Sequence, residues 1–231
     1  MQIPRRSHIL ARMSKSARTA RPFAAAERAL CRRDPILARI VADIGPCGLV
    51  PRKRYFMTLC ESIVSQQLAV KAAATIFGRF RDLFPRRMPT PAAVLATSEA
   101  KLRGAGLSTQ KLGYMRDLAG KYADGTIPAR RLGRMSDEEV AAALTQVKGI
   151  GVWTAQMFLI FVLNRPDVWP TDDLGIRKAI QVNWELPEMP VDGHLQEIAE
   201  PWRPYRSVAA WYLWASLDNK PMKNSRNRGS R

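Results

Sequence analysis

The chain has 231 residues, which suits one globular unit or two small subdomains and excludes a large multidomain machine. Hydrophobic residues make up 46% and charged residues 25% of it, so most of the chain can build a packed core and is not disordered. Lys and Arg together number 37 against 20 Asp and Glu, and the resulting net charge of +17 favours a polyanionic partner.

The positive charge is concentrated at the two ends of the chain. Residues 1–22 carry six basic residues and residues 220–231 carry five, without an acid, so residues 23–219 hold only +6. We predict a basic disordered arm at 1–22, a bipartite helical domain at 23–219 and a basic tail at 220–231. Such ends are equally typical of solubilising tails, so they do not identify the function.

Cysteines and apolar runs exclude several other classes of protein. Cys31, Cys47 and Cys60 are too widely spread for a disulfide framework or a four-cysteine metal cluster. The longest apolar run, 152–163, is shorter than the ~20 residues that a membrane span needs. The Arg-rich start lacks the apolar segment of a secretion signal, although it could imitate an organellar transit peptide. We expect no membrane attachment and a reducing, DNA-containing compartment.

Helix start and stop signals recur along the chain, and no alternating strand pattern bounded by hairpin turns occurs. We therefore predict an all-α fold. The predicted helical segments are 23–44 with a break near Asp34–Pro35, 55–80, short helices after Thr90–Pro91 and near Glu99, 108–123, 137–146, 152–163, one from Leu174, 192–199 capped by Asp192, and 204–217 opened by Pro204. Ser136 and Glu139 have the spacing of a capping box, in which each side chain satisfies a free backbone donor at the helix start.

A glycine hairpin, Val147-Lys148-Gly149-Ile150-Gly151, separates two of the predicted helices. Two glycines around one apolar residue permit a tight turn whose N–H groups face outward at the next helix start, where they can bind a phosphate. A dinucleotide-binding loop is disfavoured, because Thr154 occupies its third glycine position and the preceding segment is helical. The hairpin alone leaves open that the glycines only connect two packed helices.

The segments after the hairpin add an aromatic residue and a carboxylate. Residues 152–163 are apolar on nearly every side, which predicts a central buried helix, and Trp153 in its first turn is either a core residue or a ligand platform. A Pro-rich loop at 164–171 then delivers Asp172 and Asp173 to another helix start, where free N–H groups and the helix dipole stabilise negative charge. Only one of two adjacent aspartates can face a given cleft, and both could serve only as caps.

The order of helix, Lys-Gly-Ile-Gly hairpin, helix, Pro-rich loop and aspartate resembles the helix-hairpin-helix (HhH-GPD) superfamily of DNA glycosylases, and within it the 3-methyladenine DNA glycosylase II family. The resemblance covers roughly residues 30–217. The matching stretches are 34–46, 63–67, 106–108 with Lys111, 147–155 and 169–178. The last two of these, 147–155 and 169–178, are the ones specific to the family. The resemblance implies two helical subdomains flanking a DNA-binding cleft, with the helix-hairpin-helix motif at about 137–163.

The resemblance also implies roles for individual residues. Asp173 takes the place of the catalytic carboxylate, and Gln67 that of a side chain that fills the gap left by a flipped nucleotide. The implied DNA-binding residues are Gln67, Lys148, Gly149, Gly151 and Thr154; the implied base-pocket residues are Trp153 and Trp214; the implied donors to a structural monovalent cation are the backbone carbonyls of Thr145, Val147 and Ile150.

Departures from the superfamily pattern narrow the expected activity. Trp153 stands where strand-cleaving members carry a lysine nucleophile. The C-terminal cysteine cluster of iron–sulfur members is missing. We also expect no extra β-domain, because too few residues precede the helical core. The resemblance thus implies a monomeric, monofunctional DNA-3-methyladenine glycosylase without a cofactor. It would flip alkylated bases out of double-stranded DNA and hydrolyse their N-glycosidic bonds, which initiates base excision repair.

Two other functions remain open at this point. One is a glycosylase for deaminated or oxidised bases, and the other is a non-enzymatic helix-hairpin-helix DNA-binding protein. The expected location is the cytoplasm, at the nucleoid, in a bacterium, or the nucleus or an organelle in a eukaryote.

Overall fold

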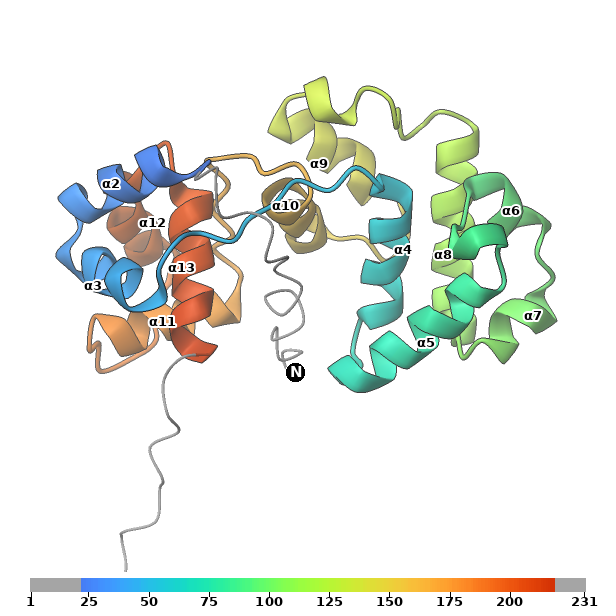
Figure 1. The fold of residues 1–231 in the computed structure, drawn as a ribbon, viewed down its shortest axis with the longest axis horizontal. Helices are drawn as coiled ribbons and strands as arrows, with labels where there is room; N and C mark the ends of the chain where they lie inside the picture. Colours follow the sequence, from blue (N-terminus) through green and yellow to red (C-terminus); the bar gives the residue numbers. More distant parts are fainter. Residues whose placement is uncertain (1–21, 219–231) are drawn as a thin grey trace, which may run out of the picture. The chain divides into compact units, whose positions relative to one another are not determined.

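The computed structural model describes residues 22–218, so the predicted tail at 220–231 and the predicted arm up to residue 21 lie outside the described residues. The described chain divides into two compact units. Unit 1 is Gly48–Pro170, and unit 2 joins the residues up to Cys47 with those from Thr171 onward. All regular structure in residues 22–218 is helical, which confirms the all-α prediction (Figure 1). No helix in this range is both long and apolar enough to cross a membrane.

Unit 1 is built around α8, coloured yellow-green in Figure 1. Its elements are α4 (Tyr55–Ser65), α5 (Val70–Asp82), η1 (Pro85–Arg87), α6 (Pro91–Ala96), α7 (Glu99–Gly104), α8 (Thr109–Ala123), η2 (Leu132–Arg134), α9 (Asp137–Thr145) and α10 (Val152–Phe161). Helix α8 packs against α4, α6 and α7, while α9 packs against α10. Leu112, Met115 and Leu118 form the buried face of α8. Polar side chains on its other faces can therefore bond to neighbouring loops.

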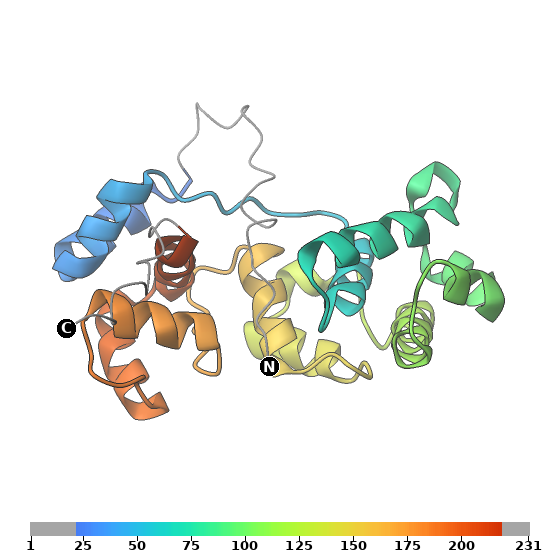
Figure 2. The ribbon, with the colours of Figure 1, turned by 90° about the horizontal axis from the view of Figure 1, so that it is seen from below.

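Unit 2 is built around its last helix. Its elements are α2 (Ala24–Arg33), α3 (Pro35–Ile44), α11 (Leu174–Asn183), α12 (Asp192–Ala199), η3 (Glu200–Trp202) and α13 (Arg206–Asp218). Helix α13 packs against α11 and against α2 and α3, and Figures 1 and 2 both show it between these elements. Every residue from Arg206 to Ser216 is buried. Each unit therefore has a core of its own. The helix predicted at 204–217 forms the centre of unit 2, a buried role that was predicted only for 152–163.

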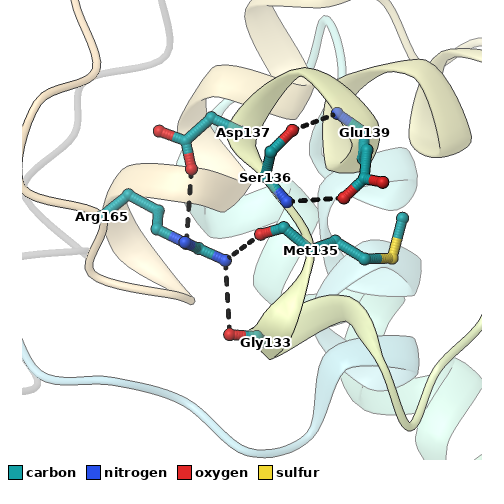
Figure 3. Close-up of polar contacts among 6 residues, drawn as sticks. All are labelled: Gly133, Met135, Ser136, Asp137, Glu139 and Arg165. Carbon is teal, nitrogen blue, oxygen red and sulfur yellow. Dashed lines mark hydrogen bonds and ion pairs between the residues drawn. The ribbon is translucent and has the colours of Figure 1, made fainter.

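Side-chain caps place most helix starts where the sequence predicts them. The break at Asp34–Pro35 is confirmed, because the Asp34 carboxylate accepts hydrogen bonds from the first amides of α3, at 2.8 and 3.1 Å. The capping box is confirmed as well: Ser136 Oγ accepts from Glu139 N at 3.2 Å, and Glu139 Oε2 accepts from Ser136 N at 2.8 Å (Figure 3).

Three predicted boundaries are wrong. The continuous helix over 55–80 is interrupted between Ser65 and Val70, where Gln67 adopts a left-handed backbone with φ of 55°. Asp192 does not cap α12: the N-cap is Val191, and the Asp192 carboxylate instead pairs with Arg177. Pro204 lies ahead of α13, which begins two residues later.

Candidate active site

The backbone of the glycine hairpin is fixed by bonds within unit 1. Ile150 N donates to Val147 O at 3.0 Å, and Lys148 N donates to Asp117 Oδ2 on α8 at 2.8 Å. The prediction that the hairpin amides all face outward is therefore wrong for Lys148 and Ile150. Among residues 22–218, the amides of the two hairpin glycines have no hydrogen-bond partner, so these two N–H groups are the ones available to an anion.

The two hairpin glycines serve different purposes. Gly149 has φ of 82°, and a Cβ built on it would lie 2.2 Å from Cδ2 of Tyr114, so the fold itself requires glycine there. Gly151 has φ of −95° and ψ of 177°, which any residue adopts, and a Cβ there would meet no atom within 4 Å. The space beside Gly151 is open, which suits the close approach of an external group.

Asp117 on α8 is a charged anchor for the hairpin. Besides Lys148 N it binds Lys121 Nζ at 2.8 Å. Partial burial by itself would raise the pKa of Asp117, but the hydrogen bonds from Lys121 and the Lys148 amide, together with both lysine charges, hold the pKa below its ordinary value. The carboxylate therefore fixes the hairpin backbone to α8 as a charge-assisted acceptor.

The two ends of the α9–hairpin–α10 segment are fastened together (Figure 3). Arg165, which follows α10, donates to Met135 O at 2.6 Å and to Gly133 O at 3.3 Å, just ahead of α9. Its Nε also lies 3.3 Å from Asp137 Oδ1, in the first turn of α9. One guanidinium therefore joins the start of α9 to the segment after α10, which holds together the two helices that flank the hairpin.

The first turn of α10 presents apolar side chains beside the hairpin. Val152 is 59% and Trp153 39% exposed, whereas Thr154 is buried, as are the later residues Phe158 and Leu159. The expectation of a buried central helix is confirmed only beyond this first turn, and the interpretation of Trp153 as a core residue is wrong. A half-exposed indole is suited to stacking against a flat ligand.

Backbone carbonyls at the hairpin have the right chemistry for the implied cation. Thr145, Val147 and Ile150 would each offer a carbonyl oxygen, the donor type that hard cations prefer. Val147 O already accepts one hydrogen bond, from Ile150 N, but a carbonyl oxygen has two lone pairs, so a second interaction is possible. Among residues 22–218, no group of three or more His, Cys, Asp or Glu side chains could hold a metal ion. The cation at the hairpin stays a prediction.

The interruption between α4 and α5 places Gln67 on the surface of unit 1. Gln67 is exposed, and its left-handed backbone turns the chain sharply. The preceding residue is bonded on both sides: Gln66 Nε2 donates to Gly149 O at 2.7 Å, and Gln66 O accepts from Lys111 Nζ at 2.7 Å. The turn that carries Gln67 is therefore attached directly to the glycine hairpin.

The predicted catalytic carboxylate lies in unit 2, at the start of α11. Asp173 is 3% exposed, and its Oδ1 accepts from Ile176 N at 2.9 Å and from Trp214 Nε1 at 2.8 Å. A Cβ at Gly175 would lie 2.9 Å from Asp173 Oδ1 and 3.2 Å from Trp214 Cδ1, so glycine permits this close packing. Two donors on one oxygen stabilise its negative charge and fix the orientation of the carboxylate.

The neighbouring aspartate has a different environment. The Asp172 side chain is 77% exposed and lies 4.0 Å from Arg177. Arg177 on α11 also donates to Thr171 O at 3.0 Å and to Pro190 O at 3.2 Å, and it pairs with Asp192. Arg177 thereby joins the loop that delivers Asp173 to the loop ahead of α12. The two aspartates are thus distinguished by burial and by partner.

The structure brings the predicted residues together in two groups. Unit 1 holds Gln67, the hairpin and Trp153, and unit 2 holds Asp173 with Trp214. The supporting residues that sequence reasoning missed are Gln66, Tyr114, Asp117 and Arg177. No motif marks Asp117 or Tyr114, because their partners lie about thirty residues away in the chain.

Comparisons with known proteins identify the family of the chain. Residues 60–208 match the family described as HhH-GPD superfamily base excision DNA repair protein. The DNA-3-methyladenine glycosylase 1 of Schizosaccharomyces pombe is 37% identical over 180 residues, which cover 77% of this chain and 79% of that one.

Two solved structures are similar as well. One is a 3-methyladenine DNA glycosylase of Schizosaccharomyces pombe in complex with abasic DNA, with a TM-score of 0.76, 36% identity and coverage of 84% of this chain and 97% of that chain. The other is a DNA-3-methyladenine glycosidase of Bacillus halodurans, with a TM-score of 0.77, 30% identity and coverage of 85% and 90%. The chain therefore belongs to the HhH-GPD superfamily of base excision DNA repair proteins.

Proposed function

We propose that this protein is a monofunctional DNA-3-methyladenine glycosylase, which hydrolyses the N-glycosidic bond of alkylated bases in double-stranded DNA. The observation that carries the proposal is the buried Asp173 carboxylate, held at a helix start by Trp214, in a chain whose relatives are named for this activity. The alternative that Asp173 only caps α11 accounts for the Ile176 amide but not for the second donor on the same oxygen, Trp214 Nε1.

The chemistry assigned to Asp173 is stabilisation of positive charge. When the base departs with the bonding electrons, the sugar develops oxocarbenium character, as in glycoside hydrolysis. A fixed carboxylate stabilises that charge and accepts a hydrogen bond from the water that attacks C1′. The water supplies the hydroxyl of the abasic sugar, and its proton leaves through the carboxylate. Trp214 orients Asp173 through its indole N–H, and its ring lines the base pocket.

The chemistry assigned to unit 1 is the capture and opening of the duplex. The Gly149 and Gly151 amides bind backbone phosphate, the exposed Lys148 is a further DNA contact, and Gln67 fills the gap left by the flipped nucleotide. The Thr154 side chain is buried and is not among the DNA contacts that we propose. The exposed Trp153 stacks on the extruded base, and an alkylated purine that carries positive charge interacts well with an indole face.

The product follows from the same residue. Strand cleavage by this superfamily needs a lysine nucleophile at the position of Trp153, so the reaction stops at an intact abasic strand. Asp173 and water suffice for hydrolysis, and we propose no cofactor beyond a structural monovalent cation at the hairpin. Because its substrate is DNA, the protein acts at the nucleoid of a bacterium, or in the nucleus or an organelle of a eukaryote.

One experiment separates this function from its alternatives. Duplex DNA treated with a methylating agent, duplex DNA with deaminated bases and duplex DNA with oxidised bases are each incubated with the protein, and the released bases are identified by chromatography. We expect 3-methyladenine from the methylated DNA. Release from only the deaminated or oxidised DNA would establish a different lesion class, and DNA binding without release of any base would establish a non-enzymatic binding protein.

A further inference from the structure

A partly buried lysine lies beside the turn that carries Gln67. Lys111 Nζ, on α8, donates to Val64 O and to Gln66 O, each at 2.7 Å. Both carbonyls belong to the C-terminal end of α4, where backbone oxygens have no helical partner and attract positive charge. No carboxylate within residues 22–218 forms an ion pair with Lys111, so these carbonyls are the groups that hold its ammonium.

Through its bond to Gln66 O, Lys111 also restrains the backbone conformation of Gln67. Gln66 C=O shares a rigid peptide plane with Gln67 N, so fixing the oxygen fixes the plane from which φ of Gln67 is measured. That φ is 55°, a left-handed value that is strained for a non-glycine residue. Such a conformation persists only where its surroundings determine it, and Lys111 supplies that determination.

The same turn is joined to the phosphate-binding hairpin. Gln66 Nε2 donates to Gly149 O at 2.7 Å, so the turn cannot move without the hairpin. Helix α8 is bonded to both the turn and the hairpin: its Lys111 donates to Gln66 O, and its Asp117 accepts from the Lys148 amide. Hydrogen bonds thus join the turn of Gln67 and the hairpin to each other, and join both to α8.

Partial burial of Lys111 affects the charge of its ammonium group. Desolvation lowers the pKa of Lys111 from its ordinary value, which means that burial disfavours its charge. An ammonium kept in such a place by two carbonyls holds them more firmly than a neutral donor would.

We propose that Lys111 is a positioning residue for base extrusion, which holds the Gln66–Gln67 turn in the left-handed form that presents Gln67 to the duplex. The inference rests on the proposed function, in which Gln67 occupies the gap left by the flipped nucleotide. Because Lys111 Nζ donates to the carbonyls of Val64 and Gln66, its effect passes through Gln67.

A double-mutant cycle tests this role. Lys111→Met and Gln67→Ala are made singly and together, with Lys101→Met as a matched control that removes an exposed lysine from α7. The single-turnover rate of 3-methyladenine release from duplex DNA should fall about tenfold or more in Lys111→Met, the scale expected for misplacing a group that positions the substrate. Added to Gln67→Ala, the same change should alter the rate by less than about twofold. Independent losses that multiply would overturn the proposal.

A second readout does not depend on base release. The probe is a duplex with a tetrahydrofuran abasic-site analogue beside 2-aminopurine, whose fluorescence rises when a side chain enters the gap and unstacks it. Lys111→Met should reduce the fluorescence change to the level of Gln67→Ala, while Lys101→Met should keep the wild-type change. An unaltered signal in Lys111→Met would overturn the proposal. A Gln67-dependent signal without any base release would contradict the proposed function and leave the role of Lys111 intact.

Folding is controlled by measuring thermal unfolding of every variant. If Lys111→Met is unfolded at the assay temperature, Lys111→Gln replaces it, since its amide can reach only one of the two carbonyls with a neutral donor. That variant should show a smaller loss that again disappears in the Gln67→Ala background. No loss of the 2-aminopurine signal in a folded Lys111→Gln would overturn the proposal.

Discussion

Replacing each hairpin glycine by alanine should separate folding from DNA binding. Gly149→Ala places a methyl group 2.2 Å from the Tyr114 ring at φ of 82°. The left-handed backbone costs about 1–2 kcal/mol for a residue with a Cβ. Overpacking against the ring adds about 1–3 kcal/mol. We expect the free energy of unfolding to fall by about 2–5 kcal/mol, which lowers Tm by at least about 5 °C for a chain of this size.

Gly151→Ala should give the opposite result. Its φ and ψ suit alanine, and nothing lies within 4 Å of the added Cβ, so the free energy of unfolding should change by less than about 0.5 kcal/mol. In the proposed binding mode, the added methyl group fills the space through which a phosphate oxygen would reach the Gly151 amide. Loss of one charge-assisted hydrogen bond, about 1.5–3 kcal/mol, weakens duplex binding about tenfold to hundredfold.

Thermal unfolding and fluorescence anisotropy with a labelled duplex measure the two effects. Gly193→Ala is the matched control, because Gly193 lies in α12 of unit 2 with open space at its Cβ position. Its DNA affinity should equal that of wild type, and its Tm should not fall, since alanine favours a helix more than glycine does. Wild-type DNA affinity in Gly151→Ala, or wild-type Tm in Gly149→Ala, would refute the distinction between the two glycines.

Three further predictions concern other parts of the site. Asp117→Asn should lower the free energy of unfolding by about 1.5–3 kcal/mol at neutral pH. Because the pKa of Asp117 is held below its ordinary 3.8, this contribution is present above about pH 4 and lost as the pH falls through the lowered pKa, so urea unfolding should show the wild-type and variant stabilities converging in acid. Trp214→Phe should slow single-turnover base release about tenfold, through loss of the donor to Asp173, whereas Trp202→Phe, which removes an indole donor to another aspartate of unit 2, should leave the rate unchanged. With Trp153 at the lyase position, sodium borohydride should trap no protein–DNA adduct during turnover, and a trapped adduct would contradict hydrolysis by water alone.

Helix starts were predictable because their signals are local. The Asp34 cap and the Ser136–Glu139 capping box depend on residues within one helical turn of each other, so the sequence contains the whole interaction. The local signal at the start of α11 did not distinguish Asp172 from Asp173; the choice of Asp173 came from the family resemblance, and the structure shows Asp173 as the N-cap of α11.

The interruption between α4 and α5 could not be predicted in this way. The apolar spacing continues through it, and neither glycine nor proline marks it. What stabilises the break is Lys111, which lies more than forty residues further along the chain. The Asp117 anchor under the hairpin was missed for the same physical reason, because its partner Lys148 comes close only once α8 and the hairpin have packed.

Asp192 shows how a correct residue type can mislead. An aspartate ahead of an apolar helix is typical of an N-cap, but its carboxylate pairs with Arg177, whose guanidinium also holds two backbone carbonyls. A charged partner with several anchors offers Asp192 a stronger interaction than a helix amide does. Long-range competition of this kind has no signature in local spacing.

The most direct test of the account is the single-turnover release of 3-methyladenine from methylated duplex DNA by wild type, Asp173→Asn and Asp172→Asn. Asparagine is also a good N-cap and can still accept from Ile176 N, so Asp173→Asn removes the charge while it keeps α11 intact. The account predicts that Asp173→Asn abolishes base release and binds DNA at least as tightly as wild type, while the exposed Asp172 tolerates the change. Full activity in Asp173→Asn, or loss of activity in Asp172→Asn alone, would contradict the assignment of the catalytic carboxylate.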